Sequence, residues 1–226
     1  MMYILKQIIA VVCGIVLVNT SAIKAQVPVR DEPRHHPVFQ NNYIRLLDVW
    51  IPPGDTSLFH IHATPSLFVI LSNTITGSQI KGEKWVKAQN VAGTAWYRSF
   101  TPDSLVHRVS NLDTVPFHVN DIELLSLYNN NNLIKNNPLP FTQLFSNEKA
   151  IAYRLNDSSF KKQIIKNRGP LVAELIKGDG LIFHDIRTNL SIEIKAGKYL
   201  YIEPGTSFYF AASGPSAIDM VLFEIR

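Results

Sequence analysis

Three histidines have the residue type and the spacing that a transition-metal site requires. His60 and His62 are two residues apart, and His107 follows later in the chain. Alternate side chains of an extended strand share a face, so His60 and His62 can point at one ion together. A third imidazole from another strand would complete the set. The sequence therefore predicts a metal site made of His60, His62 and His107.

The segments that must position these histidines have the pattern of short β-strands. Runs rich in β-branched and aromatic residues recur between turn-forming clusters such as Pro52-Pro53-Gly54-Asp55, and no long stretch keeps a convincing apolar period of 3.6. The predicted strands are 44–51, 67–71, 105–109, 117–125, 199–202 and 220–225. Short strands at this spacing indicate an all-β sandwich or barrel.

The two histidine segments resemble the two motifs of the cupin superfamily, over roughly residues 38–125. The first motif reads G-x5-H-x-H-x3,4-E-x6-G and is matched by Gly54, His60 and His62. The second reads G-x5-P-x-G-x2-H-x3-N. It is matched by Pro102, His107 and Asn111, although Ser104 replaces its inner glycine and eight residues separate Gly93 from the proline. The resemblance implies a double-stranded β-helix, or jelly-roll, barrel with His60, His62 and His107 as metal ligands.

The sequence departs from the first motif at its glutamate, the usual fourth protein ligand of the family. Ser66 and Leu67 occupy the two positions where it would fall. Asp121 and Glu123, on the strand that closes the same barrel, are the candidate carboxylates to replace it. Three neutral imidazoles with open coordination positions suit Zn²⁺, and Fe²⁺, Mn²⁺, Ni²⁺ and Cu²⁺ also accept imidazole. The ligand types alone do not choose among these metals.

Other side chains near the motifs are candidates for supporting roles. We expect His35 and His36, in the charged and proline-flanked segment 31–37, to form a mobile surface pair. Tyr97 and Arg98 precede His107 and are candidates for the rim of a pocket. Without a ligating carboxylate, any general base must come from elsewhere, and the candidates are Glu123 and His118.

A second unit with the same ancestry follows the first. Phe39-Gln40-Asn41 matches Phe145-Ser146-Asn147 at an offset of 106 residues, and Pro102-Asp103-Ser104 matches Pro204-Gly205-Thr206 at an offset of 102. These offsets place Lys166, Arg168 and Tyr209 at the positions of His60, His62 and His107. The second unit should therefore hold no metal, and we expect Lys166 and Arg168 to be solvated surface charges.

These observations give a tandem, bicupin-like organisation. The first 25 residues have a lone Lys6, an apolar run over 8–18 and a small residue, Ala25, which is the pattern of a secretory signal peptide. We expect residues 26–128 to form the metal-binding barrel and 129–142, rich in asparagine and proline, to form a linker. Residues 143–226 form the degenerate unit. The protein would be periplasmic or secreted.

Composition excludes several classes of function. The only cysteine, Cys13, lies in the predicted signal peptide, so the mature chain has neither a disulfide nor a thiolate nucleophile. Removal of Lys6 and Lys24 lowers the formal charge from +4 to +2, and the remaining basic residues are scattered, which argues against nucleic acid as a partner. No other segment is long and apolar enough for a membrane span.

Two hypotheses about function follow. In the first, the protein binds one divalent transition metal ion and acts on a small organic molecule with dioxygenase, isomerase or lyase type chemistry. In the second, it is a non-catalytic module that binds a small ligand or a metal, or that serves a structural role. A homodimer would cover exposed sheet edges in either case.

Overall fold

Strands make up nearly all the regular elements of the protein, whose structure is a computed structural model that describes residues 26–128, 138–156 and 163–226. The all-β class predicted from the sequence is confirmed. The first barrel comprises β1 (Val27–Pro28), the short 3-10 helix η1 (Val29–Asp31), β2 (His35–Gln40), β3 (Ile44–Ile51), β4 (His60–His62), β5 (Ser66–Ile70), β6 (Thr74–Ile80), β7 (Val86–Asn90), β8 (Ala95–Arg98), β9 (Leu105–Asn111) and β10 (Phe117–Leu124). None of the helices in the described ranges has the length and apolar character needed to cross a membrane.

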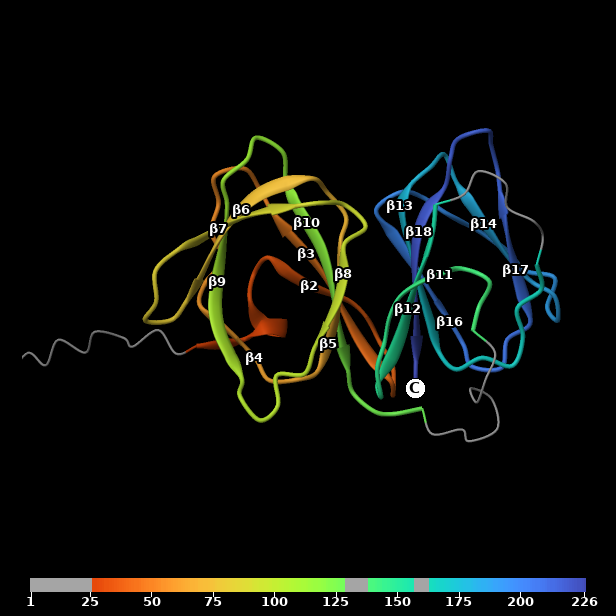
Figure 1. The fold of residues 1–226 in the computed structure, drawn as a ribbon, viewed down its shortest axis with the longest axis horizontal. Helices are drawn as coiled ribbons and strands as arrows, with labels where there is room; N and C mark the ends of the chain where they lie inside the picture. Colours follow the sequence, from red (N-terminus) through yellow and green to blue (C-terminus); the bar gives the residue numbers. More distant parts are fainter. Residues whose placement is uncertain (1–25, 129–137, 157–162) are drawn as a thin grey trace, which may run out of the picture.

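The first barrel is a jelly roll built from two five-stranded sheets (Figure 1). One sheet has the order β1-β4-β9-β6-β7 and the other β2-β3-β10-β5-β8, so strands far apart in the sequence are neighbours. Strands of the second sheet bury one face in the barrel interior, where β3 contributes Leu47, Val49 and Ile51 and β10 contributes Phe117 and Val119. The candidate site lies between the sheets: His35 is on β2 of this sheet, and His60, His62 and His107 are on β4 and β9 of the other.

The second barrel repeats this architecture with fewer strands. It comprises β11 (Thr142–Ser146), β12 (Ala150–Leu155), β13 (Leu171–Lys177), β14 (Leu181–Asp185), β15 (Ser191–Ile194), β16 (Lys198–Ile202), β17 (Phe208–Ala212) and β18 (Asp219–Ile225). Its sheets have the orders β11-β12-β18-β13-β16 and β15-β14-β17. These orders match β2-β3-β10-β5-β8 and β7-β6-β9 of the first barrel strand for strand, as expected for a duplicated unit.

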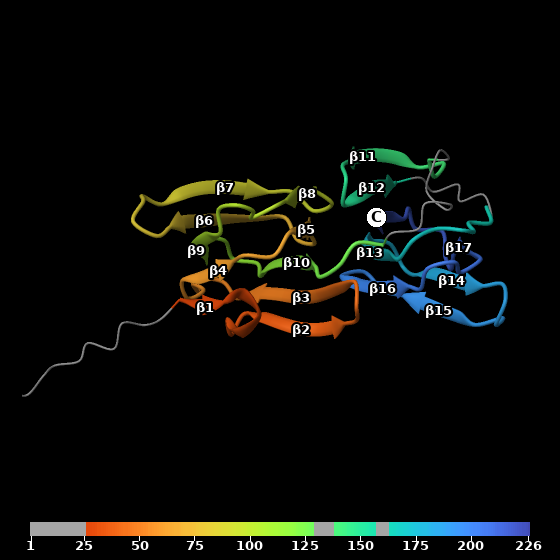
Figure 2. The ribbon, with the colours of Figure 1, turned by 90° about the horizontal axis from the view of Figure 1, so that it is seen from below.

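The two barrels pack against each other through their matching five-stranded sheets (Figure 2). The alternate residues of each strand supply this interface because successive side chains point to opposite faces of a sheet. The interface has a buried apolar cluster made of Ile44, Leu46, Leu67, Val69, Ile122, Leu124, Ala150, Ala152, Val172, Ile176, Val221, Phe223 and Ile225. Each central strand of these sheets thus contributes alternate side chains to the interior of its own barrel and to the interface between the barrels.

One buried polar pair lies between the barrels. Nδ2 of Asn120 on β10 donates a hydrogen bond of 2.9 Å to Oε2 of Glu174 on β13. Burial raises the pKa of Glu174 to about 8, although the hydrogen bond from Asn120 acts in the opposite direction. Glu174 is therefore largely protonated near neutral pH.

The interior of the second barrel is apolar where the first barrel has histidines. His60 pairs with His107 across β4 and β9, and the corresponding bridge in the second barrel joins Ile165 to Phe208. Both residues are buried in the apolar core of the second barrel. The sequence offsets had placed Lys166 and Tyr209 at the positions of His60 and His107. Each prediction is one residue too far along the chain, because loops of different length precede these segments in the two units.

The expectation that Arg168 is a surface charge is wrong. Its side chain is buried, with the residue 6% exposed, and forms an ion pair with the buried Glu224. Tyr153 lies beside the same guanidinium, with its hydroxyl 3.5 Å from Nη2. Lys166, by contrast, is exposed as predicted. Arg168 is part of the buried framework of the second barrel because a glutamate from β18 compensates its charge.

The predicted signal peptide, residues 1–25, lies outside the described residues, as does most of the predicted linker, residues 129–137. Within the described part of the linker, β11 already begins at Thr142.

Candidate metal centre

The fold brings His60, His62 and His107 together in the first barrel. His60 and His62 are the first and last residues of β4 and share its interior face. His107 on the neighbouring β9 is the Cα partner of His60. The ring centroid of His107 lies 4.6 Å from that of His60 and 5.0 Å from that of His62. The β-ladder between β4 and β9 is thus what joins the two motif segments.

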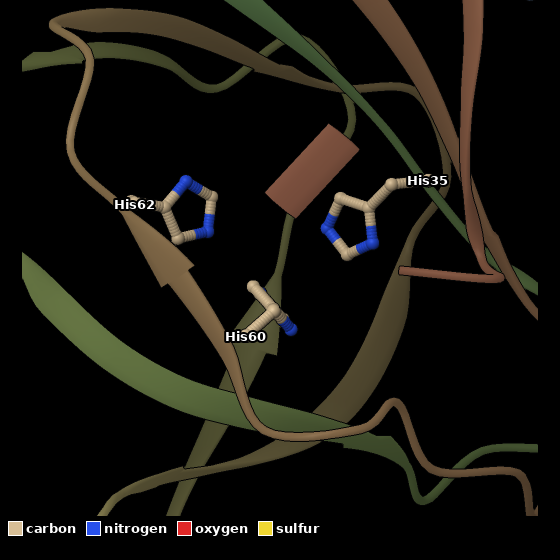
Figure 3. A group of neighbouring side chains, drawn as sticks. All are labelled: His35, His60 and His62. Atoms are coloured by element: carbon tan, nitrogen blue, oxygen red, sulfur yellow. The ribbon is translucent and has the colours of Figure 1, made fainter. Parts of the chain in front are cut away.

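A fourth histidine, His35, belongs to the same cluster. It lies on β2, is 7% exposed, and its ring centroid is 4.6 Å from that of His60. His35, His60 and His62 each offer one nitrogen, and these atoms all lie within 4.8 Å of one another (Figure 3). The expected surface pair of His35 and His36 is therefore wrong for His35, and only His36 is exposed.

A signal for His35 was present in the sequence. Two consecutive residues of a strand point to opposite faces, so if the segment is a strand, one histidine of the pair must face the barrel. The charged and proline-containing surroundings hid this signal, because they have the composition of a loop. Glu32, which the sequence reasoning did not single out, is buried beside His35.

His35, His60 and His107 each have a hydrogen-bond partner at Nδ1, which leaves Nε2 for a ligand, whereas Nδ1 of His62 is buried without a hydrogen-bond partner. Nδ1 of His35 donates to Oε2 of Glu32 at 2.7 Å, and Nδ1 of His60 donates to the carbonyl oxygen of Leu58 at 2.9 Å. Nδ1 of His107 lies 3.4 Å from Oγ of Ser78, and Nδ1 of His62 lies 3.4 Å from Oδ2 of Asp121. Partners of this kind fix the orientation and tautomer of metal-binding histidines.

The nitrogens that lie within 4.8 Å of one another belong to His35, His60 and His62, and this group does not include His107. Nε2 of His60 and Nε2 of His107 are buried and have no hydrogen-bond partner. Burying a polar nitrogen without a partner costs free energy, and a metal ion would remove that cost. These orphaned atoms show that the residues present fit a bound cation.

The lowered pKa values of His60 and His107 keep these two imidazoles able to bind a metal ion. Burial, followed by the nearby imidazoles, lowers the pKa of His60 to about 3. Burial and the surrounding histidines, with a further contribution from Arg98, lower the pKa of His107 to about 2. Both rings are therefore neutral at physiological pH, and a neutral imidazole has the lone pair that a metal needs.

Glu32 is ionised in this environment. Burial opposes its charge, but hydrogen bonds from His35 and from the backbone N–H groups of Leu58 and Arg34 outweigh this effect and lower its pKa to about 2. An ionised carboxylate at Nδ1 makes His35 a stronger donor toward a metal.

Of the two carboxylates considered as substitutes for the missing glutamate, Asp121 lies at the cluster and Glu123 is paired elsewhere. Ser66 is fully buried on the interior face, and its hydroxyl donates to the carbonyl oxygen of Thr64 at 3.1 Å. Asp121 is buried beside His62, and neither of its carboxylate oxygens has a hydrogen-bond partner, so it stays a candidate ligand. Glu123 forms an ion pair with Arg45, at 2.6 Å between Nη1 and Oε2. His35 therefore brings a fourth nitrogen to a centre that lacks the family glutamate.

Two residues considered near the site lie on the wrong face. Nε2 of His118 is 2.7 Å from Oδ1 of Asp48, and both side chains lie on the face of the sheet opposite to that of Asp121. His118 is therefore not a general base for this centre. Tyr97 packs into the interface between the barrels and is not at a pocket rim. The alternation of side chains along the strand, β10 for His118 and β8 for Tyr97, places each of these residues on the face turned away from the histidine cluster.

Aromatic rings cover the cluster on the side of β5 and β8. The ring of Phe100 stacks on that of His62, with centroids 4.9 Å apart and planes 16° apart. Phe68 stacks in turn on Trp96 at 4.9 Å. The guanidinium carbon of Arg98 lies 5.1 Å from the centre of the Phe100 ring. This side of the centre is apolar, with one cation at its margin.

Comparisons with known proteins agree with this architecture. No family model and no curated protein matches the sequence. Among solved structures, AerE from Microcystis aeruginosa matches 86% of this chain and 98% of its own, at 14% identity and a TM-score of 0.54. A mutant salicylate 1,2-dioxygenase from Pseudoaminobacter salicylatoxidans, in complex with gentisate, matches 81% of this chain and 69% of its own, at 10% identity and a TM-score of 0.55.

A cupin domain from Bordetella pertussis aligns with 45% of this chain and 98% of its own, at 20% identity and a TM-score of 0.37. The strand orders of the two barrels and the likeness to larger solved structures over most of the chain confirm the fold predicted from the histidine motifs. The chain has the cupin fold, with two barrels in tandem.

Proposed function

We propose that the first barrel binds one divalent transition metal ion through His35, His60, His62 and His107, and that the protein acts there on a small organic molecule. The observation that carries this proposal is a set of four neighbouring imidazoles with three buried ring nitrogens that have no hydrogen-bond partner, namely Nε2 of His60, Nδ1 of His62 and Nε2 of His107. A core has no structural use for buried, unpartnered nitrogens, whereas a cation does.

The chemistry of the donor set limits the metal and the reaction. Imidazole nitrogens accept Zn²⁺, Fe²⁺, Mn²⁺, Ni²⁺ or Cu²⁺. A bound ion of this kind supplies Lewis-acid polarisation of a substrate oxygen or activation of water or O₂. The residues of the chain hold and orient the ligands, and the Phe100 ring stacks on His62. Dioxygenase, isomerase and lyase type reactions are all compatible with these roles.

The structural neighbours support the proposal of a small-molecule ligand. One of them, salicylate 1,2-dioxygenase, was solved in complex with gentisate. The second barrel, with Ile165 and Phe208 at the positions of His60 and His107, would serve as a packing partner for the first.

The place of action is also part of the proposal. The signal-peptide pattern of residues 1–25 supports export to the periplasm or beyond the cell. Mass spectrometry of the protein recovered from its native compartment should give an N-terminus at Gln26. Light scattering of the same sample would test the predicted homodimer.

Elemental analysis of protein purified without a histidine tag tests the metal site. We expect about one transition-metal ion per chain, and much less in His60→Ala, His107→Ala and His35→Ala. His36→Ala is the matched control, because His36 neighbours His35 but is exposed, and it should keep the metal. A wild-type protein without stoichiometric metal, or His60 and His107 variants with unchanged metal content, would contradict the proposal.

Turnover by the metal-loaded protein against a panel of small organic molecules then separates the two functional hypotheses. Turnover that the His60→Ala variant lacks supports an enzyme. A stoichiometric metal without turnover favours the non-catalytic binding module.

A further inference from the structure

A row of five residues crosses the interior face of the sheet β2-β3-β10-β5-β8 beside the histidine cluster. The Cα partners along this row are Gln40 with Arg45, Arg45 with Glu123, Glu123 with Ser66, and Ser66 with Arg98. Side chains of directly opposed residues share one face of a sheet. Leu67 and Ile122, the neighbours of two of these residues, point into the interface between the barrels, so the row itself faces the first barrel.

The charges of this row are unevenly compensated. Arg45 and Glu123 neutralise each other through their ion pair, and Nε of Arg45 also donates to Oε1 of Gln40 at 2.7 Å. Ser66 is uncharged, and its hydroxyl is engaged by a carbonyl. In the part of the chain that the structure describes, no carboxylate lies within 4.0 Å of the Arg98 guanidinium. Arg98, which is exposed at the edge strand β8, is thus the one cation of the row without a carboxylate partner.

The identity of the residue opposite Arg98, which is Ser66, explains why Arg98 has no carboxylate partner. Ser66 occupies one of the two positions at which the motif would place its glutamate. A glutamate there would bring a carboxylate next to Arg98, whereas the short hydroxyl of serine supplies no charge. The same substitution therefore removes a ligand from the centre and leaves an arginine free at its margin.

Arg98 is close to the histidine cluster. Its guanidinium lies over the ring of Phe100, and that ring stacks on His62. The Phe100 ring therefore contacts both the Arg98 guanidinium and the His62 imidazole.

We propose that the small molecule bound at this centre carries a carboxylate, and that Arg98 is the residue that binds this carboxylate. The inference rests on the proposed function, because it names the substrate class of the same site. Guanidinium binds carboxylate through two parallel hydrogen bonds, a geometry that gives both affinity and orientation.

Calorimetric titration of the metal-loaded mature chain tests this assignment with isosteric probes. Benzoate is compared with benzamide, and pyruvate with pyruvamide, so that each pair differs in charge and little in shape. We expect at least one carboxylate to bind about tenfold or more tightly than its amide, as one charge-assisted pair typically provides. Arg98→Gln should abolish this difference and leave amide binding unchanged, while Arg98→Lys retains part of it.

Arg187→Gln is the matched control, because it removes the same charge from an exposed position of the second barrel and should change neither affinity. Equal binding of acids and amides, no binding of either carboxylate, or full carboxylate affinity in Arg98→Gln would overturn the assignment. Metal content is measured on the same samples. Absent metal means that the proposed function fails, whereas bound metal without carboxylate preference means that this inference alone fails.

Discussion

Oε2 of Glu32 lies 2.7 Å from Nδ1 of His35, and this hydrogen bond orients the one histidine of the cluster that lies outside the two motif segments. The same glutamate accepts hydrogen bonds from the backbone N–H groups of Arg34 and Leu58. The carbonyl oxygen of Leu58 in turn holds Nδ1 of His60. Glu32 thereby links β2 to the segment that leads into β4, and it positions histidines from two strands at once.

Glu32→Gln should weaken metal binding without removing any ligand. The amide is neutral and accepts through one oxygen only, so His35 becomes a weaker and less well oriented donor. We expect the metal affinity, measured by competition with a chelator, to fall about 10- to 100-fold. Asp31→Asn, at the exposed neighbouring position, should leave the affinity unchanged. Equal affinities in the wild type and Glu32→Gln would show that the contact does not act on the metal.

Phe100 has an unusual backbone conformation for a residue with a side chain. Its φ is 55°, in the left-handed region, where glycine alone avoids a steric cost of about 1 kcal/mol or more. Phe100→Ala and Phe100→Gly both remove the ring from His62, but only glycine relieves the backbone. We expect the glycine variant to be about 1 kcal/mol more stable than the alanine variant in urea unfolding.

The same pair of substitutions at Trp96, within β8, serves as the comparison, and there alanine should be the more stable variant. An alanine variant at position 100 that is as stable as the glycine variant would argue against strain at this residue. Both Phe100 variants should also release metal to a chelator faster than Phe59→Ala. Phe59 neighbours His60 but packs outside the barrel under Arg108.

Glu174 predicts a pH dependence of stability. Its pKa is about 8 in the folded protein, above its ordinary value of 4.5, so the folded state holds a proton that the unfolded state releases. Its contribution is complete below pH 4.5 and is lost as the pH rises through 8. In this window the free energy of unfolding should fall by up to about 1.4 kcal/mol per pH unit.

Glu174→Gln should remove this slope, because the amide stays neutral and keeps an acceptor for Asn120. Urea unfolding from about pH 5 to about pH 8 measures the difference between variant and wild type. Glu148→Gln, at an exposed site, should keep the wild-type slope. A wild-type slope in Glu174→Gln would mean that another group between the barrels carries the proton.

A substitution at Phe208 tests whether the second barrel has a purely structural role. Phe208 is fully buried in the second barrel, at the position that corresponds to His107. Phe208→Ala should lower the free energy of unfolding by about 3–5 kcal/mol, as expected for a large cavity, without changing the metal content of the folded protein. Leu190→Ala, at an exposed position, should cost much less. Loss of metal from folded Phe208→Ala would contradict a purely structural role.

The sequence predicted the fold and most of the histidine centre for a local reason. Alternation within a strand, with its period of two residues, puts His60 and His62 on one face. The expectation that His107 joins them came from the likeness of its segment to the second cupin motif. The short runs of β-branched and aromatic residues predicted an all-β chain, and the matched segments at offsets of 106 and 102 residues predicted two similar units. The exact equivalence of the units was missed by one residue, because insertions in loops shift an offset without changing the sheet.

By itself, then, the sequence determined which side chains alternate and which segments are strands. The tertiary structure decided which face of each strand is inside. Packing of the two sheets turned His35 toward His60, turned His118 and Tyr97 away, and buried Arg168 against Glu224. It also placed Arg98 opposite Ser66. A strand pattern is symmetric between its two faces until another sheet covers one of them, so these contacts depend on pairing between segments distant in the sequence.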